Sequence, residues 1–227
     1  MSKSIFITAT GTDVGKTYVT ALIIKKMRAA GYQAGYYKAA LSGAEATGNA
    51  LLPGDADYVN RTAAIGERLE NMVSYVYKTA VSPHLAAQLE GNPVELSQVL
   101  SDFACVSSQY EYVTVEGSGG IVCPLRYDDT QHIFLVDIIK SLQLAVLIVA
   151  DAGLGTINAV VLTIEYLKQR NIPVKGIILN HYHQGNMMEE DNRKMITEIT
   201  GVPVIALVEN EAENLDIDVQ ELLAIYE

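Results

Sequence analysis

Basic residues are scarce in this chain. Its 227 residues include 16 Lys and Arg against 27 Asp and Glu, a formal net charge of −11 at pH 7. A protein that binds the phosphate backbone of nucleic acid needs a basic face, so the charge balance argues against a nucleic-acid partner. A nucleotide site remains compatible with it, because a local lysine and a Mg²⁺ ion outweigh the global charge within a cleft.

Cysteine is rare and long apolar runs are missing. Cys105 and Cys123 form no Cys-x-x-Cys pair and no metal-ligand cluster, which favours reduced thiols in a cytoplasmic protein. The longest apolar run, 144–150, falls short of the ~18 residues of a membrane span and is typical of a buried strand. The N-terminus shows no basic-then-apolar leader pattern. These absences predict a cytoplasmic protein with no membrane partner.

Apolar strand-like runs alternate with helical patterns along most of the chain, and continuous runs such as Val146–Val149 suit strands covered on both faces. Strands are expected at 4–10, 34–39, 112–116, 144–150, 174–180 and 203–208, and helices near 16–30, 55–66, 83–90, 95–108, 132–142, 156–170, 187–200 and 218–226. The stretch 41–54 has little periodicity and is expected to be a mobile loop that could act as a lid or bind substrate. The alternation predicts an α/β fold with a doubly wound, mostly parallel sheet flanked by helices, as a single domain over residues 1–227.

The run Thr10–Thr17, Thr-Gly-Thr-Asp-Val-Gly-Lys-Thr, directly follows an apolar strand and opens a helix. Loop amides and a helix N-terminus direct positive partial charge at phosphate oxygens, Lys16 adds a full charge, and the Thr17 hydroxyl suits Mg²⁺. A strict P-loop has glycine five positions before Gly15, where this chain has Thr10. The alternative is a strand-to-helix turn that contains Gly-Lys-Thr by chance, but the strand and helix context favours a phosphate-binding loop.

Three other expected strands also end in polar residues, where an open parallel sheet binds its ligand. These are Lys38, Glu116 and Asn180. A carboxylate for Mg²⁺ and a cation for developing negative charge are what phosphoryl transfer needs, so Glu116 and Lys38 are candidates for these roles. Asp55 and Asp57 flank the start of a helix, and either is also explained as an N-cap or first-turn acid.

The histidines have simpler explanations. His181 and His183 alternate around Tyr182, but no third metal ligand stands out, so they are interpreted as surface histidines of a loop. His84 follows Ser82-Pro83, which is typical of a helix start.

Taken together, several motifs resemble the dethiobiotin synthetase family, which has a P-loop NTPase fold. They are Thr-Gly-Thr-Asp-Val-Gly-Lys-Thr at 10–17, Tyr-Lys-x-x-x-Ser-Gly at 37–43, Gly-Asp-Ala at 54–56, Ser-Pro-His at 82–84, Val-Glu-Gly-x-Gly-Gly at 115–120 and Leu-Gly-Thr-Ile-Asn at 154–158. The resemblance implies an ATP- and Mg²⁺-dependent ligase of biotin biosynthesis. Its substrates would be 7,8-diaminononanoate, CO₂ or bicarbonate, and ATP, and its course a carbamate followed by a carbamic-phosphoric anhydride.

The resemblance also implies a role for each matching residue. The residues implied to be catalytic are Lys38, Lys16 and Thr12. Those implied to bind the nucleotide are Asp13, Val14, Gly15, Lys16, Thr17, Tyr18 and Asn180, with Asn180 on the adenine. Those implied to hold Mg²⁺ are Thr17, Asp55 and Glu116. Ser42 would face the diamine, and Gly155, Thr156, Ile157 and Asn158 would receive the substrate carboxylate across a homodimer interface, at a helix start whose free amides suit an anion.

The chain departs from the family pattern at three places. Asp13 stands where the family often has Glu, and Lys38-Ala39 stands where it has Lys-Pro. The stretch 206–214 lacks the Pro-Trp-Leu pattern of some members, and this stretch would border the base.

Two other functions are compatible with such a fold. A partitioning or septum-site ATPase switch would have an extra lysine early in the phosphate loop, and residues 8–12 contain none. An amidoligase acting on a corrinoid acid would carry a glutamine-hydrolysing domain, for which this chain has no room.

Overall fold

A seven-stranded sheet forms the centre of the computed structural model, which describes residues 2–48 and 50–226. Every pairing in this sheet is parallel, in the order β11-β10-β9-β1-β6-β2-β5. Its strands are β1 (Lys3–Ala9), β2 (Ala34–Ser42), β5 (Val73–Tyr77), β6 (Tyr112–Gly120), β9 (Val146–Asp151), β10 (Val174–Tyr182) and β11 (Val204–Glu209). The predicted doubly wound α/β fold is confirmed.

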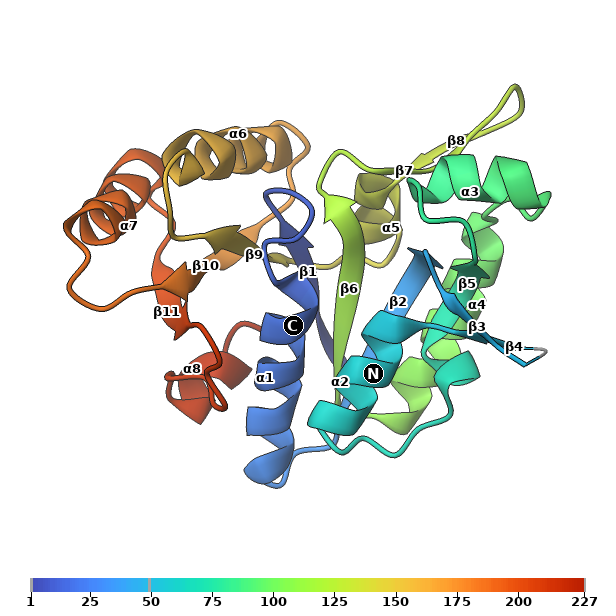
Figure 1. Cartoon of the computed structure of the whole chain (residues 1–227), viewed down its shortest axis with the longest axis horizontal. Coiled ribbons are helices and arrows are strands. Elements are labelled where there is room, and N and C mark those ends of the chain that lie inside the picture. Colours follow the sequence, from blue (N-terminus) through green and yellow to red (C-terminus); the bar gives the residue numbers. More distant parts are fainter. Residues whose placement is uncertain (1, 49, 227) are drawn as a thin grey trace.

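Helices cover both faces of the sheet (Figure 1). They are α1 (Lys16–Ala29), α2 (Gly54–Thr62), α3 (Pro83–Glu90), α4 (Leu96–Gln109), α5 (Leu135–Ser141), α6 (Thr156–Lys168), α7 (Met187–Thr200) and α8 (Val219–Leu223), with a 3₁₀ turn at Leu69–Asn71. Among the described residues, no helix has the length and apolar composition needed to cross a membrane.

The hydrophobic core forms one layer on each face of the sheet. Side chains alternate between the layers along each strand, as the pleat requires. In β9, Val146 and Ile148 face the layer that α3 to α7 cover, whereas Leu147 and Val149 face the layer of α1, α2 and α8. Burial on both faces explains why the strands are continuous apolar runs.

The chain reverses its direction of winding at β1. From β1 it passes to β2 and β5 on one side and returns at β6, and then continues through β9, β10 and β11 on the other side. β1 therefore lies between β6 and β9, and the carboxyl end of β1 is the switch point at which such sheets bind ligands.

Several expectations about short elements are wrong. Within 41–54, β2 runs to Ser42 and a hairpin of β3 (Glu45–Thr47) and β4 (Ala50–Leu52) follows, instead of an irregular loop; residue 49 lies outside the described residues. The sequence interpretation missed β5 and the hairpin of β7 (Pro124–Tyr127) and β8 (His132–Phe134). Since β8 takes 132–134, the helix expected at 132–142 begins only at Leu135. These strands have three to five residues, too few for a periodic pattern to register.

Candidate active site

The phosphate loop lies between β1 and α1, at the switch point. Gly15 has φ +80° and is the N-cap of α1. A Cβ at Gly15 would lie 2.0 Å from Nδ2 of Asn180, so no other residue fits without a shift of the loop or of β10. That same Nδ2 donates a hydrogen bond to the Val14 carbonyl at 3.1 Å. The end of β10 thus supports the loop from behind.

The first turn of α1 presents Lys16 and Thr17 to the sheet. No side chain caps this helix start, so its amides remain free for an anion. The Thr17 hydroxyl donates to Oε1 of Glu116 at 2.8 Å, and Nζ of Lys16 lies 3.9 Å from the same oxygen. The two residues that the loop motif singles out therefore meet Glu116 directly.

Lys38 lies at the centre of a buried ionic cluster. Strand register brings Lys38 of β2 opposite Glu116 of β6. Its Nζ donates to Oε1 of Glu116 at 2.8 Å and to Oδ2 of Asp55, in the first turn of α2, at 2.5 Å. Lys38 is 2% exposed and Glu116 is 1% exposed. Charges at this depth persist only when they are paired, so Lys38 and the two carboxylates are held in place by one another.

The cluster changes the proton affinities of its members. Burial alone would lower the pKa of Lys38, but the carboxylates of Glu116 and Asp55 outweigh it and the pKa is raised. Burial and the charge of Lys38 lower the pKa of Lys16, although Glu116 and Asp55 oppose the shift. Burial would raise the pKa of Asp55, but Lys38 and then Lys16 lower it. Lys38 therefore stays charged, whereas Lys16 lacks an anion of its own and is suited to receive one.

The donor set fits a magnesium ion. Oε2 of Glu116 is buried and has no hydrogen-bond partner among the described residues. The other oxygen of Glu116, Oε1, accepts from the Thr17 hydroxyl, and Asp55 shares Lys38 with it, so three side chains offer hard oxygen donors here. The described part of the chain holds no group of three His, Cys, Asp or Glu that could bind a metal ion. Mg²⁺ usually takes one or two carboxylates and completes its shell with phosphates and waters. Asp57, the alternative, instead pairs with Arg61 at 2.8 Å.

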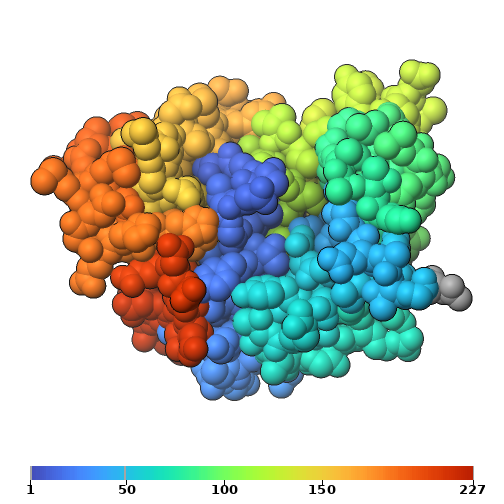
Figure 2. All heavy atoms as spheres, in the orientation of Figure 1, coloured from blue at the N-terminus to red at the C-terminus, as the bar shows by residue number. Residues whose placement is uncertain are grey.

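A cleft of about 520 Å³ opens beside the cluster. The phosphate loop that forms one wall is exposed in Figure 2 (dark blue), between the gold and orange segments of α6 and α7 and the yellow-green end of β6. The expected site residues that line the cleft are Thr12, Asp13, Gly15, Lys16, Thr17, Tyr18, Lys38, Ser42 and Asp55. The sequence interpretation missed Leu41, Ser118 and Gly119, which also line it. Ser118 and Gly119 both lie in the glycine-rich motif at 115–120, which was the signal in the sequence that could have identified them.

Four expected substrate residues lie outside this cleft. Gly155, Thr156, Ile157 and Asn158 form the start of α6, and none of them lines the cleft of the same subunit. Gly155 has φ +91° and no side chain caps the helix start. The Thr156 amide donates to the Gly153 carbonyl at 3.3 Å, and the amides that follow it at the start of α6 have no side-chain cap among the described residues.

The end of β10 differs from expectation at one residue. His181 belongs to the strand rather than to a loop, has φ +55°, and its Nδ1 lies 2.7 Å from Oδ2 of Asp151 in β9. Asn180, the expected adenine contact, is 1% exposed and lies behind Gly15 rather than on the cleft surface. Its Oδ1 is buried and unpartnered within the described residues, and so is available to an additional donor.

The stretch expected to border the base is fastened to α1. The Tyr18 hydroxyl donates to the Ala212 carbonyl, Lys25 donates to the Glu213 carbonyl and Lys26 to the Leu215 carbonyl. Side chains of α1 thus hold this stretch by hydrogen bonds to its backbone carbonyls, and the Pro-Trp-Leu pattern is not needed for this.

Comparisons with known proteins agree with this geometry. A family model described as an AAA domain matches residues 3–215. The ATP-dependent dethiobiotin synthetase BioD of Brachyspira hyodysenteriae is 52% identical over 216 residues, which are 95% of this chain and 96% of the relative. The protein of the same name from Clostridium botulinum strain Loch Maree is 47% identical over 227 residues, which are 100% of this chain and 99% of the relative.

Solved structures show the same fold at low identity. The MinC:MinD cell division protein complex of Aquifex aeolicus has a TM-score of 0.56 at 17% identity, over 93% of this chain and 83% of that chain. A ParA family ATPase from Chlorobium tepidum has a TM-score of 0.55 at 13% identity, over 99% of this chain and 90% of that one. These likenesses extend to the fold alone. At about half of all positions and over nearly the whole length, by contrast, the sequence matches the synthetases, and the chain belongs to the family of ATP-dependent dethiobiotin synthetases.

Proposed function

We propose that this protein closes the ureido ring of dethiobiotin from 7,8-diaminononanoate, CO₂ and ATP, as a step of biotin biosynthesis. The observation that carries the proposal is the cluster of Lys38, Glu116 and Asp55 beside the phosphate loop. A reaction that joins CO₂ to an amine and then phosphorylates the product brings two anions together. Fixed positive charge has to offset their repulsion, and Lys16 and Lys38 supply it.

The reaction divides into three steps. One amine of the substrate attacks CO₂ and loses a proton, which gives a carbamate. A carbamate oxygen then attacks the γ-phosphorus of ATP and ADP leaves, which gives a carbamic-phosphoric anhydride. Finally the second amine attacks the carbamoyl carbon, the C–O bond to phosphate breaks, and phosphate and a proton leave as the ring closes.

Each part of the site has a task in this sequence. The free amides of the loop and of the start of α1, with Lys16, hold the β- and γ-phosphates in line with the attacking oxygen. Lys38 faces the carbamate and neutralises it, while Thr12 and Ser42 orient the diamine by hydrogen bonds. Mg²⁺, held by Thr17, Asp55 and Glu116, would neutralise charge on the phosphates.

We further propose that the active enzyme is a homodimer in which the start of α6 serves the partner's substrate. Leu154, Asn158 and Leu162 are exposed at four-residue spacing, on one face of α6 and the turn before it. Leu154 is 91% exposed and Leu162 61%. Two such leucines on either side of the uncapped helix start favour a protein surface there, and the amides suit the substrate carboxylate.

The remaining assignments complete the proposal. The buried, unpartnered Oδ1 of Asn180 accepts from the exocyclic amine of adenine, which favours ATP over GTP. Both core layers lie on one sheet, which supports residues 1–227 as one domain. We place the enzyme in the cytoplasm, with small-molecule substrates and neither nucleic acid nor membrane as partner.

The activity is tested by incubating the protein with ATP, MgCl₂, bicarbonate and 7,8-diaminononanoate. We expect dethiobiotin by mass spectrometry and release of ADP that depends on the diamine. Folded protein that yields neither would refute the proposal. ATP-dependent dimerisation with no effect of the diamine would instead support a partitioning-type switch, and turnover of a corrinoid acid with ammonia would support the amidoligase.

A mixed-dimer experiment tests the shared site. Lys38→Met and a second variant, Gly155→Val with Asn158→Ala, are each expected to be inactive. After the two are mixed and allowed to exchange subunits, each mixed dimer has one site with both an intact lysine and an intact loop. Activity should return to about a quarter of wild type, because half of the dimers are mixed and each has one working site. If each subunit uses its own loop, the mixture stays inactive.

A further inference from the structure

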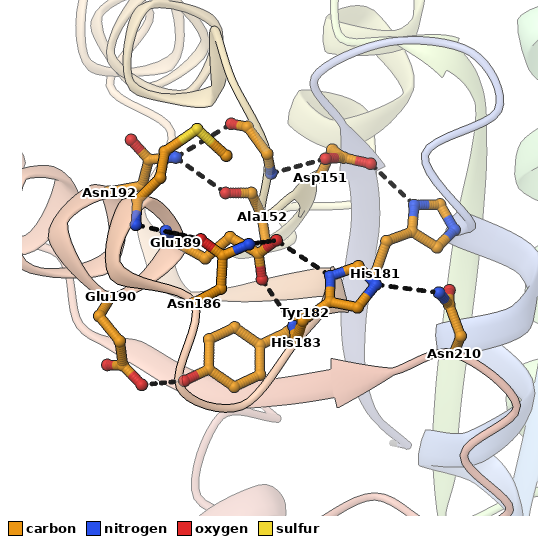
Figure 3. Close-up of polar contacts among 12 residues, drawn as sticks. Asp151, Ala152, His181, Tyr182, His183, Asn186, Glu189, Glu190, Asn192 and Asn210 are labelled. Carbon is orange, nitrogen blue, oxygen red and sulfur yellow. Dashed lines mark hydrogen bonds and ion pairs between the residues drawn. The ribbon is translucent and has the colours of Figure 1, made fainter.

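The Asp151–His181 pair lies between the phosphate loop and the start of α6. Figure 3 shows His181 between Asp151 and the phosphate loop (blue ribbon). Its Nδ1 is bonded to Oδ2 of Asp151 at 2.7 Å, while its Nε2 lies 3.7 Å from the point where a Cβ of Gly15 would be. The imidazole therefore abuts the phosphate loop with one edge and the end of β9 with the other.

Asp151 also holds the turn that leads into α6. Its Oδ1 accepts a hydrogen bond from the Gly153 amide at 2.7 Å. A Cβ at Gly153 would lie 2.8 Å from this oxygen, so the turn follows the carboxylate closely. One carboxylate thus joins the turn to His181, whose imidazole lies beside Gly15.

Hydrogen bonds to Asn180 and Asn192 also hold the turn at 152–155 rigidly in place. The Ala152 amide donates to the Asn180 carbonyl at 2.8 Å. Nδ2 of Asn192 in α7, a residue 6% exposed, donates to the carbonyls of Ala152 and Gly153 at 2.9 and 3.0 Å. The two hydrogen bonds of Asn192 appear in the upper left of Figure 3. A turn held at this many points passes a shift of Asp151 on to the residues that follow, where α6 begins.

We infer that Asp151 and His181 are positioning residues that couple the phosphate loop to the turn at 152–155. A nucleotide bound to the loop fixes the position of Gly15. Gly15 then fixes the position of the His181 imidazole, and through the Asp151 carboxylate that of the first amides of α6. This inference rests on the proposed function, in which those amides hold the carboxylate of the substrate bound by the partner. ATP in one subunit then strengthens binding of the diamine in the other, and the diamine strengthens binding of ATP by the same factor.

The test measures how a non-hydrolysable ATP analogue with MgCl₂ changes the dissociation constants of two ligands, by calorimetry. One ligand is 7,8-diaminononanoate and the other is 7,8-diaminononane, which has no carboxylate. For each ligand, the analogue lowers the dissociation constant by some factor. Contacts inside one site change this factor equally for both ligands, so the ratio of the two factors reports the contribution of the carboxylate alone. We expect a ratio of about five or more in the wild type, the lower end of ordinary coupling between sites.

The informative variant is His181→Asn. Asparagine tolerates a positive φ but is too short to reach from Asp151 to Gly15, so the ratio should fall to about one. Asp151→Asn keeps an acceptor for Gly153 and can pair with the other tautomer of His181, so it should retain most of the coupling. His183→Asn is the matched control: His183 also pairs with a carboxylate, Glu189, at 3.0 Å, but this pair is bonded neither to Asp151 nor to Gly153.

An unchanged ratio in His181→Asn, or a ratio of one in the wild type, overturns the inference. A wild type that makes no dethiobiotin refutes the proposed function instead, and a mixed dimer without activity refutes the shared site. Should His181→Asn not fold, hydrogen exchange of the wild type decides. Exchange of the Gly153 amide must slow on addition of the nucleotide analogue alone, and an unchanged rate contradicts the coupling.

Discussion

Two hydrogen-bonded side-chain pairs of similar length have different surroundings and different uses. Lys38–Glu116 and Asp151–His181 span 2.8 and 2.7 Å, and each joins the ends of strands in the same sheet. The side chains of the first pair are 3% and 0% exposed, whereas those of Asp151 and His181 are 47% and 39% exposed. Water screens the second pair, so it contributes little stability. If the buried pair loses Lys38, Glu116 keeps only Lys16, at 3.9 Å, as a charged partner, and a buried charge that loses its close partner is costly.

This difference separates two kinds of functional residue. In the proposed reaction Lys38 has to stay charged and fixed while a carbamate and a phosphate meet, and its contacts with the buried Glu116 and the partly exposed Asp55 ensure both. In the inferred coupling, Asp151 and His181 link the phosphate loop to the turn at 152–155, and an exposed, weak pair suits this task because it can shift without breaking the core. Catalytic charge and coupling thus have different requirements for burial.

The largest effect should come from Lys38→Met. We expect the turnover number to fall about 10²–10³-fold, as when one preorganised group at a developing charge is removed. Glu116 would keep only the Thr17 hydroxyl and the more distant Lys16 as partners, and this loss should destabilise the protein by about 3 kcal/mol. Steady-state kinetics and urea unfolding measure both. Lys168→Met, which removes an exposed pair with Glu165, is the control and should leave both values near wild type. Equal stability of the two variants would show that the cluster is no more important than a surface pair.

Gly15→Ala should have the next largest effect. The new Cβ would meet Nδ2 of Asn180 at 2.0 Å and would sit at φ +80°. Gly31→Ala is the matched control, because Gly31 has φ +90° but no atom within 4 Å; it should cost only the backbone strain, about 1 kcal/mol. We expect Gly15→Ala to weaken ATP binding about 100-fold, roughly 2.7 kcal/mol, in calorimetry, and Gly31→Ala to leave it unchanged. If both variants bind ATP equally, the contact with β10 does not shape the loop.

Local patterns in the sequence are enough to predict the site that holds Lys38 and Glu116. The phosphate loop is contiguous in the sequence, and Lys38 and Glu116 each end an apolar run. Since parallel sheets bind ligands at the carboxyl ends of their strands, the sequence alone predicts that these residues share one site. Their contact depends on β2 and β6 being neighbours, which the rule does not require but the register confirms. The predicted sheet was correct because long buried strands have a clear pattern.

The Asp151–His181 pair could not be predicted from local patterns. His181 and Asp151 are 30 positions apart and meet because β9 and β10 pair with Asn180 opposite Asp151. Nothing local in His-Tyr-His reveals that register, so both histidines were interpreted as surface residues of a loop. The hairpin β3–β4 was missed for another reason, since its strands have three residues each and polar neighbours.

Asp55→Asn should weaken Mg²⁺ binding and change the response to acid. The concentration of MgCl₂ for half-maximal activity should rise at least about tenfold, the smaller effect seen when even an outer-shell partner of a metal is lost. The pKa of Asp55 is lowered in the folded state. The stability it contributes is thus present above its unfolded pKa and is lost as the pH falls through the folded pKa. In urea unfolding from pH 6 to 2, ligand-free Asp55→Asn should lose less stability than the wild type. A steeper loss in the variant would contradict this sign.

The smallest effect should come from Asp57→Asn, two residues further along the same helix. Asp57 pairs at 2.8 Å with Arg61, whose side chain is 71% exposed, and both lie on α2. An exposed pair at this spacing contributes about 0.3–0.5 kcal/mol, and a first-turn acid adds a similar amount through the helix dipole. The variant should therefore lose less than about 1 kcal/mol of stability in urea unfolding and keep the wild-type requirement for MgCl₂. A rise in that requirement as large as for Asp55→Asn would mean that the metal lies at the solvent side of α2 rather than beside Glu116. The assignment of the buried cluster as the ion's site depends on this contrast between two aspartates in one helical turn.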